Sequence, residues 1–391
     1  MRIGIVVPTF PTGVTSSEVW LAHGLAGRGH EVTVFSSDRA ATRDRAWGRG
    51  DGSPPPSNFP FRVQRISSLP LAYAEASVPI RVSEVLGSHP DVCLLQEDYP
   101  PLSQFVAHAA HSDGIPYILT CERYDDLDRG IPWLAVRAFE RTTLPRLWRF
   151  SAALTFHSRA SMRFFAARGV PRGRIHYIPS CTNSQLFRPS GGPSPPAVEA
   201  LWSTGARRTR VLTVARLHPA KGLDTLARAI SLARRAAPSI EGLIHGRGPD
   251  EPRLRATIAS IRVGQDLSLD PSSFSLADLP ELYRSADMYV QPSRREPFGM
   301  AALEAMACGL PVIASATGGL ADLVEDGTNG LLVPPGDAEA LGAAISRLAE
   351  DVELRRRMGR ASRERAESLF EMSTVSRAYE DLILRTQSST S

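Results

Sequence analysis

Two glutamates, Glu296 and Glu304, have seven residues between them in the segment EPFGMAALEAMACGLPVIA. We expect a helix to begin near Met300, so both carboxylates lie close to a helix start. Free backbone N–H groups of a helix start can hold a phosphate, and carboxylates accept hydrogen bonds from sugar hydroxyls. The acidic residues could instead only complement the helix dipole, an interpretation that fits Glu296 better than Glu304.

A second candidate group of residues is cationic. Arg216 follows the strand pattern RVLTVA, and Lys221 comes five residues later, before a helix. Lys221 is the only lysine among the 45 lysine and arginine residues of the chain. Two cations beside a helix start favour a phosphate site, because the N-terminus of a helix attracts negative charge. From this stretch alone, a helix entry with solvated charges explains the pattern equally well.

Glycines follow two other predicted strands. The string HGRGPD contains Gly246, Arg247 and Gly248, and a glycine pair, Gly318 and Gly319, comes after LPVIAS. Glycine lets a backbone approach a ligand closely, but any tight turn also favours it. The glycines therefore support the site mainly because they fall at the same predicted edge of the sheet.

The elements that position these residues repeat a simple pattern in the first half of the chain. Short apolar runs alternate with helical segments such as 16–29 and 158–169, which end in glycine. Nearly continuous apolar strands between helices indicate a parallel sheet covered on both faces. In such sheets ligands bind beyond the carboxyl ends of the strands. The predicted strands are 2–8, 31–37, 61–66, 91–96, 116–121, 152–157 and 174–179.

The same alternation restarts after a proline- and glycine-rich stretch at 187–200, which is the best linker candidate. We therefore predict two doubly wound α/β domains, 1–188 and 189–365, with a C-terminal helix and frayed tail at 366–391. That helix is expected to pack back toward the first domain. The strands predicted in the second domain are 210–216, 240–246, 287–293, 310–315 and 330–335.

Composition narrows the function classes. The net charge of +4 comes from dispersed arginines without interleaved aromatics, which argues against a nucleic-acid partner. The four cysteines form no C-x-x-C pair, and no apolar run approaches the ~20 residues of a membrane span. We expect a cytoplasmic protein, with contact to the inner face of the cell membrane left open by the arginine- and aromatic-rich segment 137–150. Packing of those aromatics into the core is the favoured alternative.

Taken together, the motifs resemble those of the retaining glycosyltransferases of GT-B fold, the group usually called family 4. Glu296 and Glu304 match its E-x7-E motif. The resemblance extends over most of the chain, and this many motifs in the right order are highly specific. They are GHEVTVFSS, IPSCTNSQLFRP, ARLHPAKGLDTLARAI, HGRGPD, LPELYRSADMYVQPS and DGTNGLLVPPGD.

The resemblance implies a GT-B fold, with two Rossmann-like domains that face a central cleft. The first domain would bind an acceptor and the second a nucleotide-sugar. By the same resemblance Arg216 and Lys221 hold the donor diphosphate, Glu304 contacts the ribose, and Glu296 touches the transferred sugar. Further donor contacts would come from Phe298, Gly299, Met300, Gly246, Arg247, Ser16 and Ser17.

The chain departs from the family pattern in its first domain. Ser16 and Ser17 replace a common Gly-Gly pair, and they could contact the donor or simply cap the first helix. Glu122 stands where many relatives carry a histidine, and it could act as an acceptor-side base. Glu97 and Asp98 also occupy a position where histidine is frequent. Of the nine histidines only His157 is well placed, and a structural role is expected for it.

The expected activity is a metal-independent transfer of a sugar from a UDP- or GDP-sugar to a small-molecule, glycan or lipid-linked acceptor. No cofactor and no metal are predicted; the one D-x-D-like string, at 124–128, lies in the acceptor domain. Two alternatives stay open: a non-catalytic nucleotide-sugar-binding partner subunit, and a relative that hydrolyses or epimerises its donor. A nicotinamide-dependent dehydrogenase is disfavoured because no G-x-G-x-x-G turn follows the first strand.

Overall fold

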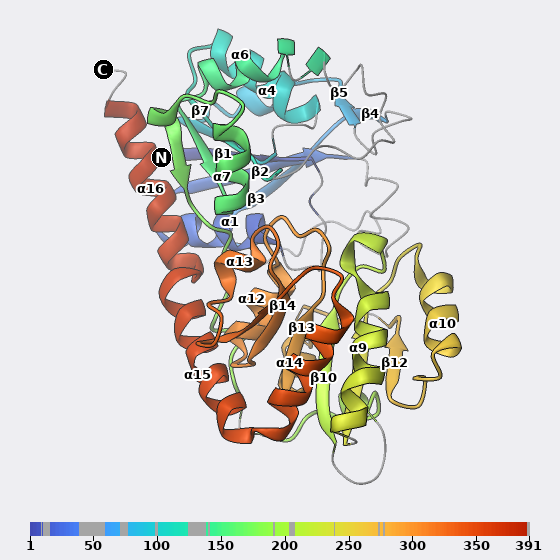
Figure 1. The fold of residues 1–391 in the computed structure, drawn as a ribbon. Helices are drawn as coiled ribbons and strands as arrows, with labels where there is room; N and C mark the ends of the chain where they lie inside the picture. The colour runs from blue at the N-terminus through green and yellow to red at the C-terminus, as the bar shows by residue number, and fades with distance from the viewer. Residues whose placement is uncertain are drawn as a thin grey trace. The chain divides into compact units, whose positions relative to one another are not determined.

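The computed structural model describes residues 1–8, 10, 16–38, 59–70, 77–97, 101–123, 138, 139, 141–190, 192–202, 208–237, 239–272, 274–276 and 278–388. The chain forms two compact units (Figure 1). Unit 1 comprises Met1–Cys181 and Met372–Ser391, and unit 2 comprises Thr182–Glu371.

Unit 1 is built on a seven-stranded parallel sheet with the order β3-β2-β1-β6-β7-β8-β9. Every strand predicted from the sequence is present within one or two residues. The order reverses direction beside β1, as in doubly wound sheets. The strands are β1 Arg2–Val7, β2 Glu31–Ser37, β3 Arg62–Ile66, β6 Val92–Leu95, β7 Tyr117–Thr120, β8 Ala153–Phe156 and β9 Ile175–Tyr177.

Among the described residues, the remaining elements of unit 1 are helices and an antiparallel pair of strands, β4 Ser68–Pro70 with β5 Ser77–Pro79, which the sequence did not predict. In α6, Leu147 and Trp148 are buried whereas Phe150 is 43% exposed, so core packing accounts for Trp148 but not for Phe150. The helices are α1 Ser17–Gly27, α3 Ser83–Leu86, α4 Pro101–Ser112, α6 Leu144–Phe150, α7 Arg159–Ala166, η1 Arg172–Arg174 and α16 Met372–Ser388.

The C-terminal helix α16 packs against α1 within unit 1 (Figure 1). Val375, Tyr379 and Ile383 of α16 are buried. Its Glu380 pairs with the Arg28 guanidinium and with His30 Nε2, the latter at 2.8 Å. The last helix of the chain thus belongs to the core of the first unit.

Unit 2 contains a six-stranded parallel sheet with the order β12-β11-β10-β13-β14-β15. Five of its strands were predicted. The edge strand β12 was missed because its sequence, LSLD, has too few apolar residues to stand out. The strands are β10 Thr209–Val214, β11 Ile240–His245, β12 Leu267–Asp270, β13 Met288–Gln291, β14 Val312–Ser315 and β15 Gly330–Val333.

Helices cover this second sheet, and α9 and α14 pack closely against each other. One cluster of buried aliphatic side chains joins α9, α14 and the strands. The helices are α8 Pro196–Glu199, η2 Pro219–Lys221, α9 Leu223–Ala236, α10 Glu251–Ser260, α11 Leu279–Arg284, α12 Met300–Ala307, α13 Leu320–Leu323, α14 Ala338–Glu350 and α15 Val352–Leu369.

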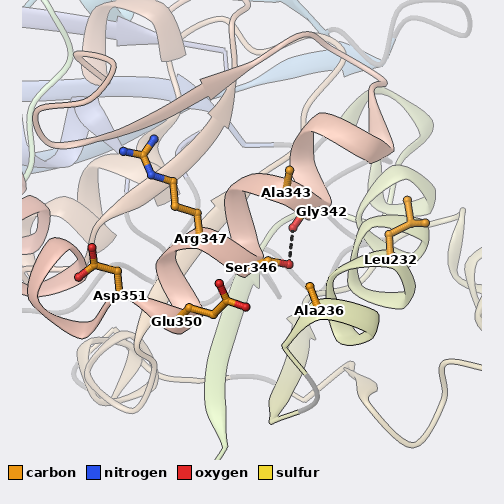
Figure 2. A pocket seen from close by; sticks show the side chains of 8 residues that line it. All are labelled: Leu232, Ala236, Gly342, Ala343, Ser346, Arg347, Glu350 and Asp351. Carbon is orange, nitrogen blue, oxygen red and sulfur yellow. Dashed lines mark hydrogen bonds between the residues drawn. The ribbon is translucent and has the colours of Figure 1, made fainter.

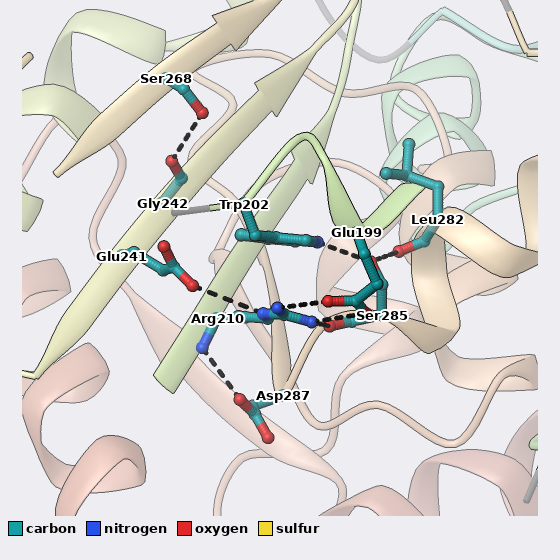
Figure 3. A network of polar contacts seen from close by, with 9 residues as sticks. All are labelled: Glu199, Trp202, Arg210, Glu241, Gly242, Ser268, Leu282, Ser285 and Asp287. Atoms are coloured by element: carbon teal, nitrogen blue, oxygen red, sulfur yellow. Dashed lines mark hydrogen bonds and ion pairs between the residues drawn. The ribbon is translucent and has the colours of Figure 1, made fainter. Parts of the chain in front are cut away.

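The amino-terminal ends of these strands are tied together by Arg210 (Figure 3). Its guanidinium contacts Glu199 of α8 at 2.6 and 2.9 Å and Glu241 of β11 at 3.4 Å. It also lies 5.2 Å from the ring of Trp202, whose Nε1 donates to Ser285 Oγ. This network anchors α8 to the edge opposite the predicted ligand site.

Both units are therefore parallel-sheet Rossmann-like domains, which confirms the predicted fold class. Among the helices that the structure describes, none is long and apolar enough to span a bilayer.

Candidate active site

The donor-binding residues predicted in the second domain gather at one edge of the unit 2 sheet. β10, β11 and β13 run parallel, so the segments that follow their last residues leave the sheet on the same side. Arg216 and Lys221 come after β10, Gly246 after β11 and Glu296 after β13. The tertiary structure thus brings together side chains separated by up to 80 residues of sequence.

Lys221 and Glu296 are in direct contact. The Lys221 Nζ lies 2.7 Å from Glu296 Oε2, and the side chains are 13% and 9% exposed. A charge-assisted hydrogen bond of this length is among the stronger polar contacts in proteins. The ammonium and the carboxylate singled out separately in the sequence therefore form one pair.

Glu296 Oε2 receives two further hydrogen bonds. Gln291 Nε2 and Ser293 Oγ each donate to it across 2.9 Å. Gln291 Oε1 in turn lies 2.5 Å from the hydroxyl of Tyr289, and burial raises the pKa of that phenol well above its ordinary value. Sequence reasoning missed these three residues, although all stand in the motif string YVQPS.

The loop that carries Lys221 fits tightly against the loop after β13. The carbonyl of Ala220 accepts the N–H of Arg294 at 2.8 Å. The Arg294 guanidinium makes two 2.8 Å contacts with the carboxylate of Asp224 in α9. Gly222 adopts φ 64°, and a Cβ there would lie 2.1 Å from the Pro292 carbonyl oxygen. These contacts fix the distance between the stems of Lys221 and Glu296.

Glu304 is buried one turn inside α12, at 2% exposure. The Tyr283 hydroxyl of α11 donates to Glu304 Oε2 across 2.6 Å. Burial, together with the nearby charge of Glu304, raises the pKa of Tyr283 well above its usual range. The phenol therefore stays protonated and holds one carboxylate oxygen in place. A carboxylate that only complements the helix dipole does not need to be buried. The burial of Glu304 is therefore not explained by the dipole interpretation.

The start of α12 is formed as the sequence predicted. Met300 is its first residue, Gly299 precedes it with φ 111°, and no side chain caps the helix. Phe298 is buried against Phe370. A Cβ on Gly319 would come within 2.4 Å of Phe298 Cα, so Gly319 allows close packing of this loop.

Gly246 and Arg247 lie beside the Arg216 loop. The N–H groups of Ala215 and Leu217 donate to the carbonyls of His245 and Arg247 at 3.0 and 2.8 Å. Arg216 therefore stands on a loop that is hydrogen-bonded to the glycine turn. The Arg247 side chain is exposed, and its Nε donates to the Pro271 carbonyl.

His245 introduces a further polar pair at this edge. Its Nδ1 lies 2.8 Å from Asp270 Oδ2. Burial opposes ionisation of Asp270, but hydrogen bonds from His245 and Ser272 outweigh it and lower the pKa of the carboxyl to about 2. Sequence reasoning missed this pair because β12 itself was not predicted.

The remaining predicted residues belong to unit 1. Ser16 caps α1 by accepting the Val19 N–H at 3.4 Å, and Ser17 Oγ accepts the N–H of Cys181 at 3.3 Å. The capping interpretation thus describes Ser16. Glu122 Oε1 lies 3.3 Å from His157 Nε2.

His157 is almost fully buried, and its Nδ1 lies 2.9 Å from the Ile178 carbonyl. Burial lowers the pKa of His157, although this backbone contact and the charge of Glu18 oppose the shift. Glu97 adopts a positive φ of 69°. Asp98 and the acidic string at 124–128 lie outside the described residues. Within the described ranges no group of three or more histidine, cysteine or acidic side chains is arranged to hold a metal ion.

A hollow of about 510 Å³ lies between α9 and α14 (Figure 2). Leu232 and Ala236 of α9 face Gly342, Ala343 and Ser346 of α14 across it. No predicted site residue lines it, so the hollow contributes nothing to the site at the strand ends.

Solved structures of similar fold support the architecture. Sucrose-phosphate synthase from Thermosynechococcus elongatus matches over 100% of both chains with a TM-score of 0.76 and 24% identity. The HepE protein of Anabaena, solved in complex with UDP, matches over 98% of this chain and 100% of its own with a TM-score of 0.77 and 20% identity. The chain thus has the GT-B fold.

Family models cover both units. The model for glycosyl transferases group 1 matches residues 203–365, and the model for the glycosyl transferase 4-like domain matches residues 12–181. An alpha-mannosyltransferase of Mycobacterium tuberculosis, described as GDP-mannose-dependent, is 30% identical over 90% of this chain and 89% of its own length. The chain therefore belongs to the group 1 glycosyltransferases, family 4.

Other relatives match over less of their length. The D-inositol 3-phosphate glycosyltransferase of Saccharomonospora viridis is 36% identical over 194 residues, which cover 47% of this chain and 44% of that protein. The chain thus aligns with less than half the length of this relative.

Proposed function

We propose that this chain transfers a sugar from a nucleoside-diphosphate sugar to an acceptor, with retention of the anomeric configuration and without a metal ion. A UDP- or GDP-sugar is the proposed donor, because HepE was solved with UDP and the mycobacterial relative is named for GDP-mannose. A small molecule, a glycan or a lipid-linked sugar is the proposed acceptor.

The observation that carries this proposal is the Lys221–Glu296 pair at the carboxyl edge of the sheet. Arg216 lies on the same loop after β10 that leads to Lys221. We assign Arg216 and Lys221 to the donor diphosphate and Glu296 to the transferred sugar. A cation beside a carboxylate matches a ligand that joins an anionic phosphate to a neutral, hydroxyl-rich ring.

The chemistry needs both kinds of group. Breaking the anomeric C–O bond leaves negative charge on the departing diphosphate and positive charge on the sugar ring. Preorganised cations at the diphosphate lower this barrier, and loss of one such stabiliser typically slows a reaction ~10²- to 10³-fold. A carboxylate beside the ring stabilises the positive charge on the sugar and accepts hydrogen bonds from its hydroxyls.

Glu304 is the proposed ribose contact. Tyr283 holds one of its oxygens at 2.6 Å inside a buried site, so the carboxylate is oriented before a donor arrives. Phe298, Gly299 and Met300 would offer backbone N–H groups at the uncapped start of α12. Gly246 and Arg247, on the neighbouring loop after β11, are further proposed donor contacts.

Unit 1 supplies the proposed acceptor side. Glu122 is our candidate for a base, since a carboxylate near neutral His157 can accept a proton. Ser16 and Ser17 stay candidates for donor contact, in addition to their hydrogen bonds within unit 1.

The test compares Lys221→Ala and Glu304→Ala with the wild type. Each change should lower donor-dependent release of UDP or GDP by at least ~10²-fold, because each removes a preorganised polar contact. Calorimetry should still record a folded protein. Arg356→Ala, which removes an exposed ion pair on α15, is the matched control and should keep full activity.

The same assay separates the alternatives. Binding of UDP or GDP by the wild type without turnover on any acceptor would indicate a non-catalytic partner subunit. Release of free monosaccharide in the absence of acceptor would indicate donor hydrolysis. Normal turnover in Lys221→Ala or Glu304→Ala would contradict the assignment of the site.

A further inference from the structure

Lys221 has two anionic partners in the proposed reaction. In the structure its ammonium contacts Glu296 Oε2 at 2.7 Å, whereas the proposed function assigns it to the donor diphosphate. A buried carboxylate that loses its cation pays a large desolvation cost unless other groups satisfy it. Glu296 therefore needs other hydrogen-bond donors if the ammonium moves to the diphosphate.

The structure contains such groups at the same oxygen. Gln291 Nε2 and Ser293 Oγ both donate to Glu296 Oε2, and Gln291 Nε2 also donates to Ser293 Oγ, each across 2.9 Å. The two amide hydrogens of Gln291 and the hydroxyl hydrogen of Ser293 are thus all directed within this triangle. Gln291 and Ser293 are 2% and 0% exposed, so water does not compete for these donors.

The Glu296 carboxylate determines which end of the Gln291 amide faces it, because only the amide nitrogen can donate to it. At the other end of the amide, the Tyr289 hydroxyl lies 2.5 Å from Gln291 Oε1 and 3.0 Å from the Val214 carbonyl. If the amide were reversed, its carbonyl oxygen would face the Glu296 carboxylate, and the two would repel. The donor orientation of Gln291 is therefore built into the strand end.

We infer that Lys221 exchanges partners, from Glu296 to the donor diphosphate, and that Gln291 and Ser293 are positioning residues that hold the Glu296 carboxylate when it does. This inference rests on the proposed function. Lys221 suits the exchange because its ammonium is a compact charge on a flexible stem, whereas a guanidinium has a rigid planar fork. Glu296 then competes with the diphosphate for the ammonium, and Gln291 and Ser293 weaken that competition.

If Glu296 competes with the diphosphate for Lys221, a variant with a neutral side chain at position 296 should bind nucleotide more tightly. Glu296→Gln removes the competing charge, so it should bind UDP or GDP about 3- to 10-fold more tightly than the wild type while losing transfer. Gln291→Met leaves Lys221 as the main partner of the carboxylate, so it should weaken nucleotide binding by about 3- to 10-fold without touching the nucleotide.

The experiment is a double-mutant cycle. Titration calorimetry with UDP or GDP, whichever stabilises the wild type, gives Kd for the wild type, both single variants and Glu296→Gln/Gln291→Met. The double variant should bind like Glu296→Gln alone, because Gln291 acts only through the carboxylate. Ser293→Ala is a smaller second change and should act like Gln291→Met. Ser346→Ala, which removes a buried hydroxyl on α14, is the control and should bind like the wild type.

The outcomes are distinct. Weaker nucleotide binding by Glu296→Gln would show that the carboxylate only orients Lys221, and it would overturn the exchange. An equal effect of Gln291→Met in both backgrounds would assign that residue a general structural role and would also overturn it. A folded wild type that binds neither nucleotide would refute the proposed function, and the inference with it.

Discussion

At the scale of single residues, the two glutamates of the site are held by different neighbours. Tyr283 donates to Glu304, and Glu296 accepts from Lys221, Gln291 and Ser293. Because these partners occupy one oxygen of each carboxylate, the side chains are oriented without a ligand. Unit 1 has a comparable buried group, His157 beside Glu122, and its properties can be tested through pH.

His157 should make unfolding depend on pH. Burial is the main cause that lowers its pKa below the usual 6.5, so between the folded and the unfolded pKa the unfolded chain binds more protons. The contribution of neutral His157 to the free energy of unfolding is complete above about pH 6.5. It is lost as the pH falls, by up to ~1.4 kcal/mol per pH unit. His157→Gln should flatten this slope in chemical denaturation as the pH falls below about 6.5.

The control for this measurement is His108→Gln, which replaces an exposed imidazole on α4. It should keep the wild-type slope. An unchanged slope in His157→Gln would mean that other groups, such as His23 and His176, whose pKa values burial also lowers, dominate the pH dependence.

At the scale of elements, the site depends on loops that meet beyond the strand ends. The Lys221 loop contacts the loop after β13 through Ala220, Gly222 and Arg294. These contacts are between backbones, so a single added methyl group can separate the ammonium from the carboxylate. This makes Gly222 a position where stability and activity should change together.

Gly222→Ala tests that coupling. The substitution places a Cβ 2.1 Å from the Pro292 carbonyl oxygen, so the backbone has to move. We expect a loss of roughly 3 kcal/mol or more in unfolding free energy, of which ~1–2 kcal/mol reflects the left-handed conformation. Activity should fall as well, because Lys221 is the neighbouring residue.

Gly327→Ala is the matched control. Gly327 also has a positive φ, 79°, but nothing lies within 4 Å of an added Cβ. It should lose only the ~1–2 kcal/mol of the backbone conformation and keep its activity. Equal losses in the two variants would show that the contact with Pro292 is unimportant.

At the scale of the whole chain, the C-terminal helix belongs to the unit formed by the N-terminal residues. α16 lies on α1, where Gly24 leaves room for Ser376 and for the Met372 carbonyl. The chain therefore completes its first unit only when its last helix is present.

A matched pair of glycines in α1 tests this packing. In Gly24→Ala the new Cβ would meet Ser376 Oγ at 2.7 Å and Met372 O at 2.9 Å, whereas nothing lies within 4 Å of a Cβ at Gly27. Calorimetry should detect a loss of roughly 1–3 kcal/mol for Gly24→Ala. Gly27→Ala should be neutral or stabilising by up to ~1 kcal/mol, since alanine favours helices. A stabilising effect of both changes would contradict close packing of α16 on α1.

The sequence by itself determined the fold class, because apolar strands and amphipathic helices are local patterns that a parallel sheet requires. It also placed Arg216, Lys221, Glu296 and Glu304 after the right strands or in the right helix. It did not predict β12 or the β4–β5 pair, whose short or polar strands carry little periodicity.

Only the tertiary structure decided which of these residues touch. The contact of Lys221 with Glu296 joins positions 75 residues apart, and the donors Gln291, Ser293, Tyr289 and Tyr283 became visible only through their distances. Hydrogen bonds act over about 3 Å, and sequence spacing fixes such distances only within one helix or strand. The lysine was identifiable as unusual from the sequence, whereas its partner required the fold.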